Sequence, residues 1–214
     1  GGLSRYSTDY RWLVPHFEKM LYDNSLFTTA LIEAYQVTGK KEFADYANDL
    51  LNYIDRDMTS DEGAFFSAED ADSEGVEGKF YVWSKEEIEK ILGRKTASLA
   101  IPFYNVTQKG NFEGKNILHL TRGPETVAKE IGVNTYDFSK ELQIAREKLL
   151  EVRSKRIRPL LDDKILTSWN SLMISAMAKS GRVLEDQSRI EKAAKAMQFL
   201  LDRLRTSEGK MLRR

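Results

Sequence analysis

The residues best suited to chemistry lie close together in the stretch from Trp12 to Asn24. This stretch combines the imidazole of His16, the carboxylates of Glu18 and Asp23, and the amide of Asn24. A histidine with a carboxylate partner can titrate near neutral pH and act as a general acid or base. The stretch therefore predicts an acid–base site. The alternative is structural: His16 hydrogen-bonds to backbone, and the two carboxylates stabilise the N-terminus of a helix.

A second set of carboxylates lies in the acidic loop from Glu69 to Gly78. Asp70, Asp72 and Glu74 have the spacing that opens an EF-hand calcium loop, but Tyr81 stands where the closing glutamate belongs. We therefore do not expect an EF-hand. Carboxylates at the mouth of a cleft can instead bind sugar hydroxyls or act as acid and base. A plain solvated loop is the alternative.

A third candidate is the start of a predicted helix at Trp169 and Asn170. The indole can stack on a sugar ring while the amide bonds to its hydroxyl groups. The alternative is that Ser168 caps the helix and Trp169 packs into the core. The basic run from Arg153 to Arg158 suits either a helix C-terminus, which we favour, or a phosphate site.

Composition excludes several other kinds of site. The 214 residues carry 33 basic and 33 acidic side chains, so no net charge attracts nucleic acid or an anionic membrane. Cysteine is absent, which excludes disulfides, a thiol nucleophile and thiolate metal sites. With only His16 and His119, a histidine-rich zinc site is also excluded, and we expect neither a metal nor a cofactor. The lack of a signal peptide or membrane-spanning pattern favours a cytoplasmic location.

The elements that position these residues are helices, which the periodic spacing of apolar residues predicts. Ser84 and Glu87 form a capping-box pattern, and Pro124 suits the first turn of a helix. Gly39 follows the first helix and is a typical stop signal. The predicted helices cover approximately residues 22–38, 41–58, 85–92, 96–103, 135–154, 167–183 and 189–204, with another that begins at Pro124.

The sequence also predicts which parts of these elements are buried or extended. In the first helix the apolar stripe consists of Leu26, Phe27, Ala30, Leu31, Ala34 and Tyr35. The β-prone residues 64–67 and 79–83 flank the acidic loop and predict a small hairpin, and residues 117–120 are a strand candidate.

A weak internal repeat joins the two ends of the chain. Asn24-Ser25-Leu26 opens one helix and Asn170-Ser171-Leu172 opens another. Each of these helices is followed by a second amphipathic helix and then by a glycine-bearing turn, at Gly63 and at Gly209. A repeated helical hairpin with structured loops on one side predicts an α/α array.

Four segments together resemble the signature blocks of the spermatogenesis-associated protein 20 family. They are Gly1 to Asp9, Trp12 to Asn24, Ser67 to Trp83 and Asp162 to Met173. Ser4 departs from the family pattern, because histidine is expected there, and that departure puts catalysis by this position in doubt.

The resemblance implies a fold and a place for the site. A thioredoxin-like domain is expected before Gly1. Residues 1–214 are expected to form one fragment of a helical ring, and the rest of that ring is expected to lie outside these residues. The expected fold class is mainly α: an incomplete α/α toroid of helical hairpins with short β-hairpin excursions in the loops. It is similar to six-hairpin glycosidases and to N-acylglucosamine and cellobiose 2-epimerases, whose sites lie at the mouth of the ring.

By that resemblance the candidate site residues fall into two groups. The catalytic candidates are His16, Glu18, Asp23, Asp70 and Asp72. The substrate-binding candidates are Arg5, Tyr22, Asn24, Glu69, Trp169 and Asn170.

Two functions are compatible with these residues. The first is a cofactor-independent enzyme that acts on a carbohydrate, as a sugar epimerase or isomerase or as a glycoside hydrolase. The second is a non-catalytic binding or scaffold module that serves the attached thioredoxin-like domain.

Overall fold

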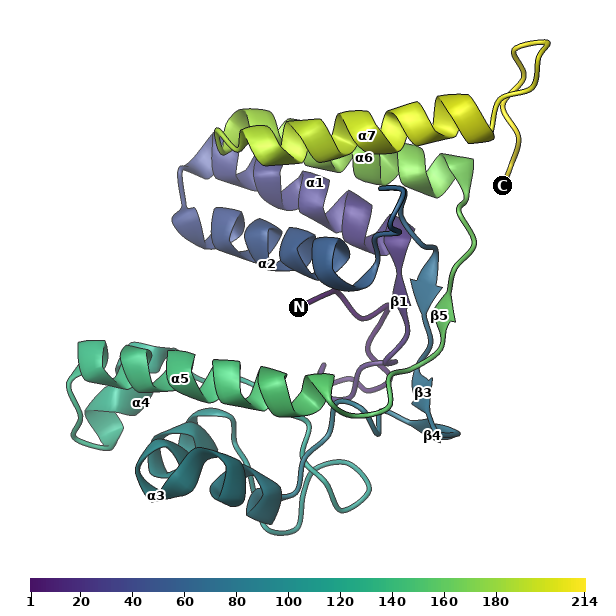
Figure 1. The fold of residues 1–214 in the computed structure, drawn as a ribbon. Coiled ribbons are helices and arrows are strands. Elements are labelled where there is room, and N and C mark those ends of the chain that lie inside the picture. Colours follow the sequence, from purple (N-terminus) through teal and green to yellow (C-terminus); the bar gives the residue numbers. More distant parts are fainter. The chain divides into compact units, whose positions relative to one another are not determined.

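The structure, a computed structural model, describes residues 1–214 and is mainly α (Figure 1). The chain folds as two compact units. The first unit contains residues 1–6, 16–71 and 160–214, and the second contains residues 7–15 and 72–159. The predicted class of helical hairpins with short β excursions is confirmed. The larger ring, and the assignment of residues 1–214 to it as one fragment, stay predictions. No helix combines the length and the apolar character that crossing a membrane requires.

The first unit consists of two helical hairpins and a small sheet. Helix α1 packs against both α2 and α6, and α6 packs against α7. Gly39 ends α1 in the left-handed conformation, with φ of 68°, and only Lys40 then precedes α2, so the two helices run antiparallel (Figure 1). The elements are β1 (Lys19–Met20), α1 (Leu21–Thr38), α2 (Lys41–Asp57), β2 (Ala68–Glu69), β5 (Leu161–Asp162), α6 (Thr167–Val183) and α7 (Gln187–Arg203).

The two hairpins, α1–α2 and α6–α7, have equivalent turns, bridges and hydrogen bonds. After α2 the chain turns at Gly63, and after α7 it turns at Gly209, each with a positive φ. Each turn is closed by an isolated β-bridge, Thr59 with Phe65 and Arg205 with Met211. The chain then returns to the start of its own hairpin: the N–H of Leu21 donates to Ser67 O, and that of Thr167 donates to Arg213 O, both at 2.9 Å. The predicted repeat is therefore a structural one.

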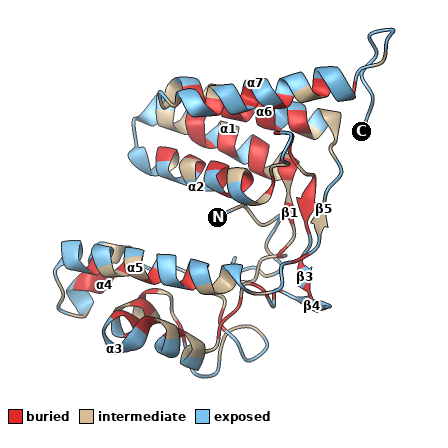
Figure 2. Cartoon of the chain, viewed as in Figure 1, coloured by how far each residue is buried: buried red, intermediate tan, exposed pale blue.

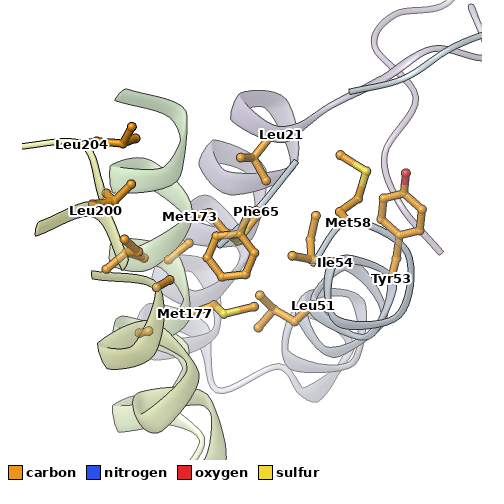
Figure 3. Packing of buried hydrophobic residues seen from close by; sticks show 14 residues of the cluster. Leu21, Leu51, Tyr53, Ile54, Met58, Phe65, Met173, Met177, Leu200 and Leu204 are labelled. Carbon is orange, nitrogen blue, oxygen red and sulfur yellow. The ribbon is translucent and has the colours of Figure 1, made fainter. Parts of the chain in front are cut away.

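The core of the first unit lies between the two hairpins. Phe65, which is 1% exposed, lies among apolar side chains from both of them, as Figure 3 shows. The labelled neighbours include Leu21 and Leu51 from the first hairpin and Met173 and Met177 from the second. Buried residues recur along each of these helices (Figure 2). This core fixes the positions of the helix N-termini that carry the candidate site.

The predicted apolar stripe of α1 is partly wrong. Leu26 and Phe27 are 54% and 43% exposed, whereas the buried face carries Asn24, Ser25 and Thr28. Small and polar residues occupy this face because α1 is contacted by two helices and by incoming backbone, which needs close approach and hydrogen-bond partners.

The second unit has its own core, built on α3 and α5. The predicted capping box is present: Ser84 Oγ accepts from the Glu87 N–H at 3.1 Å, and Glu87 Oε2 accepts from the Ser84 N–H at 2.7 Å. The two predicted helices 85–92 and 96–103 form one element with a kink at Gly93, where φ is 72°. The elements are β3 (Asp72–Ser73), β4 (Val76–Glu77), α3 (Lys85–Phe103), α4 (Pro124–Glu130) and α5 (Thr135–Ser154).

Two predictions about strands are wrong. Residues 64–67 and 79–83 do not pair with each other; the hairpin is β3–β4, inside the acidic loop. Residues 117–120 form no strand, because only the preceding residue, Asn116, makes a bridge, to Trp83. Propensity marked these segments as extended, but the partner of an extended segment is set by tertiary contacts.

Candidate functional site

A three-stranded sheet carries the acidic part of the candidate site. The strand order is β1-β2-β5, with both pairs antiparallel. Met20 is paired with Ala68 and Ala68 with Asp162, so these three side chains share one face. Glu18 and Asp70, two positions along from Met20 and Ala68, continue the alternation. This face lines a cavity of about 600 Å³, formed by Glu18, Met20, Ala68, Asp70, Leu160, Leu161, Asp162, Asp163 and Lys164.

The sheet therefore brings together two predicted residues, Glu18 and Asp70, with one that was not predicted, Asp162. Lys164 Nζ lies 2.8 Å from Asp162 Oδ2. Burial acts to raise the pKa of Asp162, but hydrogen bonds from Lys164 and Ser67 outweigh it and lower the pKa. The cavity thus presents several acidic side chains together with the cation of Lys164.

Arg5 and Glu18 form the next layer of the site. Arg5 Nη1 lies 3.1 Å from Glu18 Oε2, and the Arg5 N–H donates to the Glu18 carbonyl oxygen at 3.0 Å. Hydrogen bonds from Arg5 to Glu18 and Tyr22 raise the pKa of the guanidinium. Backbone pairing of the N-terminal segment with β1 thus positions a fixed positive charge beside Glu18.

Asp23 lies in the first turn of α1, next to this ion pair. Its Oδ2 atom is buried and has no hydrogen-bond partner. Burial raises the pKa of Asp23, the charge of Arg5 opposes that shift, and the charge of Glu18 adds to it. Two neighbouring carboxyl groups therefore differ: the pKa of Asp23 is raised by burial, and Glu18 is paired with a cation.

His16 does not line the cavity. Its ring stacks on the Tyr6 ring, with centroids 4.8 Å apart and an interplanar angle of 23°. Its backbone N–H donates to the Tyr6 carbonyl oxygen at 2.9 Å. Its Nδ1 atom is buried without a hydrogen-bond partner. Part of the structural alternative therefore holds, because backbone pairing fixes His16, while its ring nitrogen is not used in that pairing.

Tyr22 and Trp169 meet at the N-termini of α1 and α6. Their ring centroids are 4.8 Å apart, with an interplanar angle of 59°. Both side chains are partly exposed, and Trp169 also packs against the hydrophobic core. Tyr22 thus contacts Trp169 and also contributes to the raised pKa of Arg5.

Three of the substrate-binding candidates are buried and have structural partners. Asn24 accepts the Leu3 N–H at 2.8 Å and donates to Met20 O at 2.8 Å. Asn170 makes the corresponding bonds to Phe65 and Leu166. Glu69 is 1% exposed in the central strand, opposite Lys19. We assign the two asparagines a structural role, because their amides hold backbone groups in place and are inaccessible to a ligand.

Asp72 is the one candidate that falls in the second unit. It lies on β3 and is exposed, paired in register with Glu77. It therefore does not belong to the sheet that carries Glu18 and Asp70.

Asp162 and Lys164 were missed as site residues, although the segment that contains them was singled out. Their place depends on the pairing of β2 with β5, between residues far apart in the chain. One feature of the sequence could have indicated these residues: the acidic pair Asp162-Asp163 lies beside a short apolar run. No group of three or more His, Asp or Glu side chains is arranged to hold a metal ion.

Comparisons with known proteins show that the chain is similar to a segment of longer proteins. No protein-family model matches it. It is 34% identical to spermatogenesis-associated protein 20 of Homo sapiens, across 93% of this chain and 28% of that protein. The proteins of the same name from Rattus norvegicus and Mus musculus are 33% and 32% identical with the same coverage. The chain is similar to one segment of the spermatogenesis-associated protein 20 proteins.

The resemblance predicted from the sequence is thus confirmed. The chain spans about 28% of the length of these relatives, and their name states no reaction or ligand. Among solved structures, cellobiose 2-epimerase from Bacillus thermoamylovorans is similar over 89% of this chain and 62% of that chain. Its identity is 13% and the TM-score is 0.24, so the similarity carries no argument about the reaction.

Proposed function

We propose that this segment carries the acid–base groups of a cofactor-independent carbohydrate-processing enzyme, of the sugar epimerase or isomerase type or the glycoside hydrolase type. The observation that carries the proposal is the difference between two neighbouring carboxyl groups. Asp23 has a raised pKa and a buried oxygen without a partner, whereas Glu18 is paired with Arg5 and lines a cavity. A carboxyl group whose pKa is raised by burial, beside a second carboxyl group that is paired with a cation, is typical of acid and base pairs.

Both reaction types need one protonated and one ionised group. A hydrolase protonates the glycosidic oxygen while a carboxylate activates water or attacks the sugar, and an epimerase removes a proton from carbon and returns one on the other face. In our proposal Asp23 is the acid and Glu18 the base, with His16 Nδ1 as a second proton carrier. Asp70, Asp162 and Lys164 bind hydroxyl groups, for which their charged oxygen and nitrogen atoms are suited.

The test uses a full-length protein of this family and a panel of reducing mono- and disaccharides. Epimerisation is followed by deuterium uptake at the carbon next to the carbonyl group, and hydrolysis by release of reducing ends. Glu18→Gln and Asp23→Asn should each lower kcat by roughly a hundredfold to ten-thousandfold, the usual contribution of general acid–base groups. Sugar binding by these variants should persist, because their shapes are unchanged.

The matched control is Asp45→Asn, on the exposed surface of α2 in the same unit. It removes one carboxylate without touching the cavity, so kcat should stay at the level of the unmodified protein. Failure of every sugar to bind or react, or equal loss of activity in Asp45→Asn, would rule out the proposed site.

A second candidate function, the binding module, is favoured by a different feature. Tyr10 and Trp12 are each 84% exposed on the loop of residues 7–15. Asp9 holds this loop, because its carboxylate accepts the N–H groups of Leu13 and Val14 at 2.8 Å. Exposed tyrosine and tryptophan on an ordered loop are typical of protein-binding hot spots.

The module hypothesis proposes that this loop binds the attached thioredoxin-like domain. In a titration of the chain with a separately produced thioredoxin-like domain from the same family, Trp12→Ala should weaken binding by more than tenfold. Glu18→Gln should leave it unchanged. Binding that survives Trp12→Ala would exclude this loop as the contact.

A further inference from the structure

The second unit contains a cavity that the proposed site does not use. Its volume is about 520 Å³, which is within the usual range for small-molecule sites. Apolar side chains form much of its wall, and they come from the β3–β4 hairpin, the segment after it, the loop between α3 and α4, and the segment after α5: Val76, Phe80, Val82, Phe112 and Ile157. Charged side chains, including Glu87, Lys115 and Arg156, complete it.

The wall that carries Lys115 is held in one conformation. The Lys115 and Phe112 backbones exchange two hydrogen bonds, at 2.8 and 3.0 Å, around a tight turn with positive φ at Glu113 and Gly114. Gly110 approaches so closely that a Cβ atom there would lie 2.2 Å from Lys115 O. The next residue, Asn116, is buried and pairs with the backbone of Trp83. Binding of a ligand would therefore cost little conformational entropy in this wall.

Arg156 presents two different edges. Its Nη1 donates to the carbonyl oxygens of Phe80 at 2.9 Å and Val82 at 2.8 Å, and its guanidinium lies 3.8 Å from the Trp83 ring centroid. The other edge, Nε and Nη2, makes no hydrogen bond, and Nη2 has only Glu87 Oε1 at 3.5 Å. An arginine edge with two parallel N–H donors matches the two oxygens of a carboxylate.

The carboxylate of Glu87 serves both Lys115 and Arg156, two of the cationic side chains that line the cavity. Glu87 lies 3.5 Å from Arg156 and 3.3 Å from Lys115, and its Oε2 also accepts the Ser84 N–H. Burial lowers the pKa of Arg156, and the charge of Glu87 offsets this only in part. Glu77 and Glu113, which also line the cavity, are exposed on hairpins, where water screens their charges.

We propose that this cavity binds a small organic carboxylate with an apolar body, whose carboxylate takes the place of Glu87 at the Nε and Nη2 edge of Arg156 and also bonds to Lys115. The apolar body lies against Val76, Phe80 and Ile157. This function is independent of the acid–base site in the first unit.

The test compares three probes of the same shape that differ in charge: 3-phenylpropanoate, 3-phenylpropanamide and 3-phenylpropan-1-amine. Binding to the 214-residue chain is measured by calorimetry and by the NMR signal of the Trp83 indole, which lies under Arg156. The carboxylate should bind about tenfold more tightly than the amide, a difference typical of one added charge-assisted hydrogen-bond pair. The amine should bind more weakly than either.

Variants of the charged residues locate the contact. Arg156 also holds backbone carbonyls, so Lys115 and Glu87 are changed instead. Lys115→Met should weaken carboxylate binding by about tenfold. Glu87→Gln should strengthen it by roughly threefold to tenfold, because it removes the competing carboxylate, and glutamine still completes the capping box. Lys148→Met, on the exposed face of α5, is the charge-matched control and should have no effect.

Three outcomes would overturn the proposal. Tighter binding of the amine would assign the cavity to cations, through Glu77 and Glu113. Weaker or unchanged carboxylate binding in Glu87→Gln would show that Glu87 does not compete with the ligand. Absence of binding of all three probes at millimolar concentration would remove the site.

Discussion

The side chain of Asn170 binds both backbone groups of Phe65. Its Oδ1 accepts the Phe65 N–H and its Nδ2 donates to the Phe65 carbonyl oxygen, each at 2.8 Å. Asn24 forms the same pattern with the N–H of Leu3 at 2.8 Å and its carbonyl oxygen at 3.4 Å. In both hairpins an asparagine one turn into the first helix therefore fixes an incoming strand-like segment.

Removal of the Asn170 amide should destabilise the first unit. Asn170→Ala leaves the buried N–H and carbonyl groups of Phe65 without partners, at a cost of about 1–3 kcal/mol each. We expect the free energy of unfolding in urea to fall by about 3 kcal/mol. Ser171→Ala, at the exposed adjacent position, should change it by less than about 0.5 kcal/mol. Equal effects of the two variants would contradict this role.

Asp23 should make the protein less stable as pH rises. Its folded pKa is raised above the usual 3.8, so the folded state holds the proton more tightly than the unfolded chain. Its stabilising contribution is complete below pH 3.8 and is lost as pH rises through the folded pKa. Asp23→Asn cannot ionise, so its stability relative to the unmodified protein should increase with pH across that window, measured by urea unfolding at each pH.

Asp186, the N-cap of α7, provides a control of opposite sign. A hydrogen bond from the Ser188 side chain is the main cause that lowers the pKa of Asp186. Its contribution is present above the unfolded value of 3.8 and lost as pH falls through the folded pKa. Asp186→Asn should therefore lose relative stability as pH rises from strongly acidic values toward 3.8. The same sign for both variants would refute the assigned shifts.

The charges around Asp23 should act separately on its pKa. Arg5→Gln removes a positive charge and should raise the pKa of Asp23 further, whereas Glu18→Gln removes a negative charge and should lower it. Carboxyl-carbon NMR titration of the variants measures both shifts. An Asp23 pKa that moves in the same direction in both variants would show that the three groups do not form one cluster.

The contact between α6 and α7 should not tolerate a larger residue at Gly181. A Cβ atom there would lie 2.7 Å from Ile190 Cγ1 and 2.8 Å from the Asp186 carbonyl oxygen. Overpacking typically costs about 1–3 kcal/mol, against a gain of about 1 kcal/mol in helix propensity. Gly181→Ala should therefore lower the free energy of unfolding by about 1 kcal/mol, whereas the exposed Ser175→Ala should not lower it. A stabilised Gly181→Ala would contradict this packing.

Local signals in the sequence determined the helices and their ends. The capping box at Ser84 and the glycine stop at Gly39 act within a few residues, so they could be read without the fold. The Asn-Ser-Leu repeat likewise marked the equivalence of α1 and α6. The same amino-acid pattern did not reveal what the asparagines do, because their partners, Leu3 and Phe65, are distant in the chain.

Only the tertiary structure decided which carboxylates share a surface. Pairing of β2 with both β1 and β5 brings Asp70 and Asp162 to the cavity with Glu18, while Asp72 belongs to the other unit. Side-chain direction alternates along a strand, so strand register determines which residues meet. The sequence by itself determined that acidic, aromatic and imidazole groups are present in the right segments. Burial beside Arg5 and Glu18, which raises the pKa of Asp23, is a property of the fold alone.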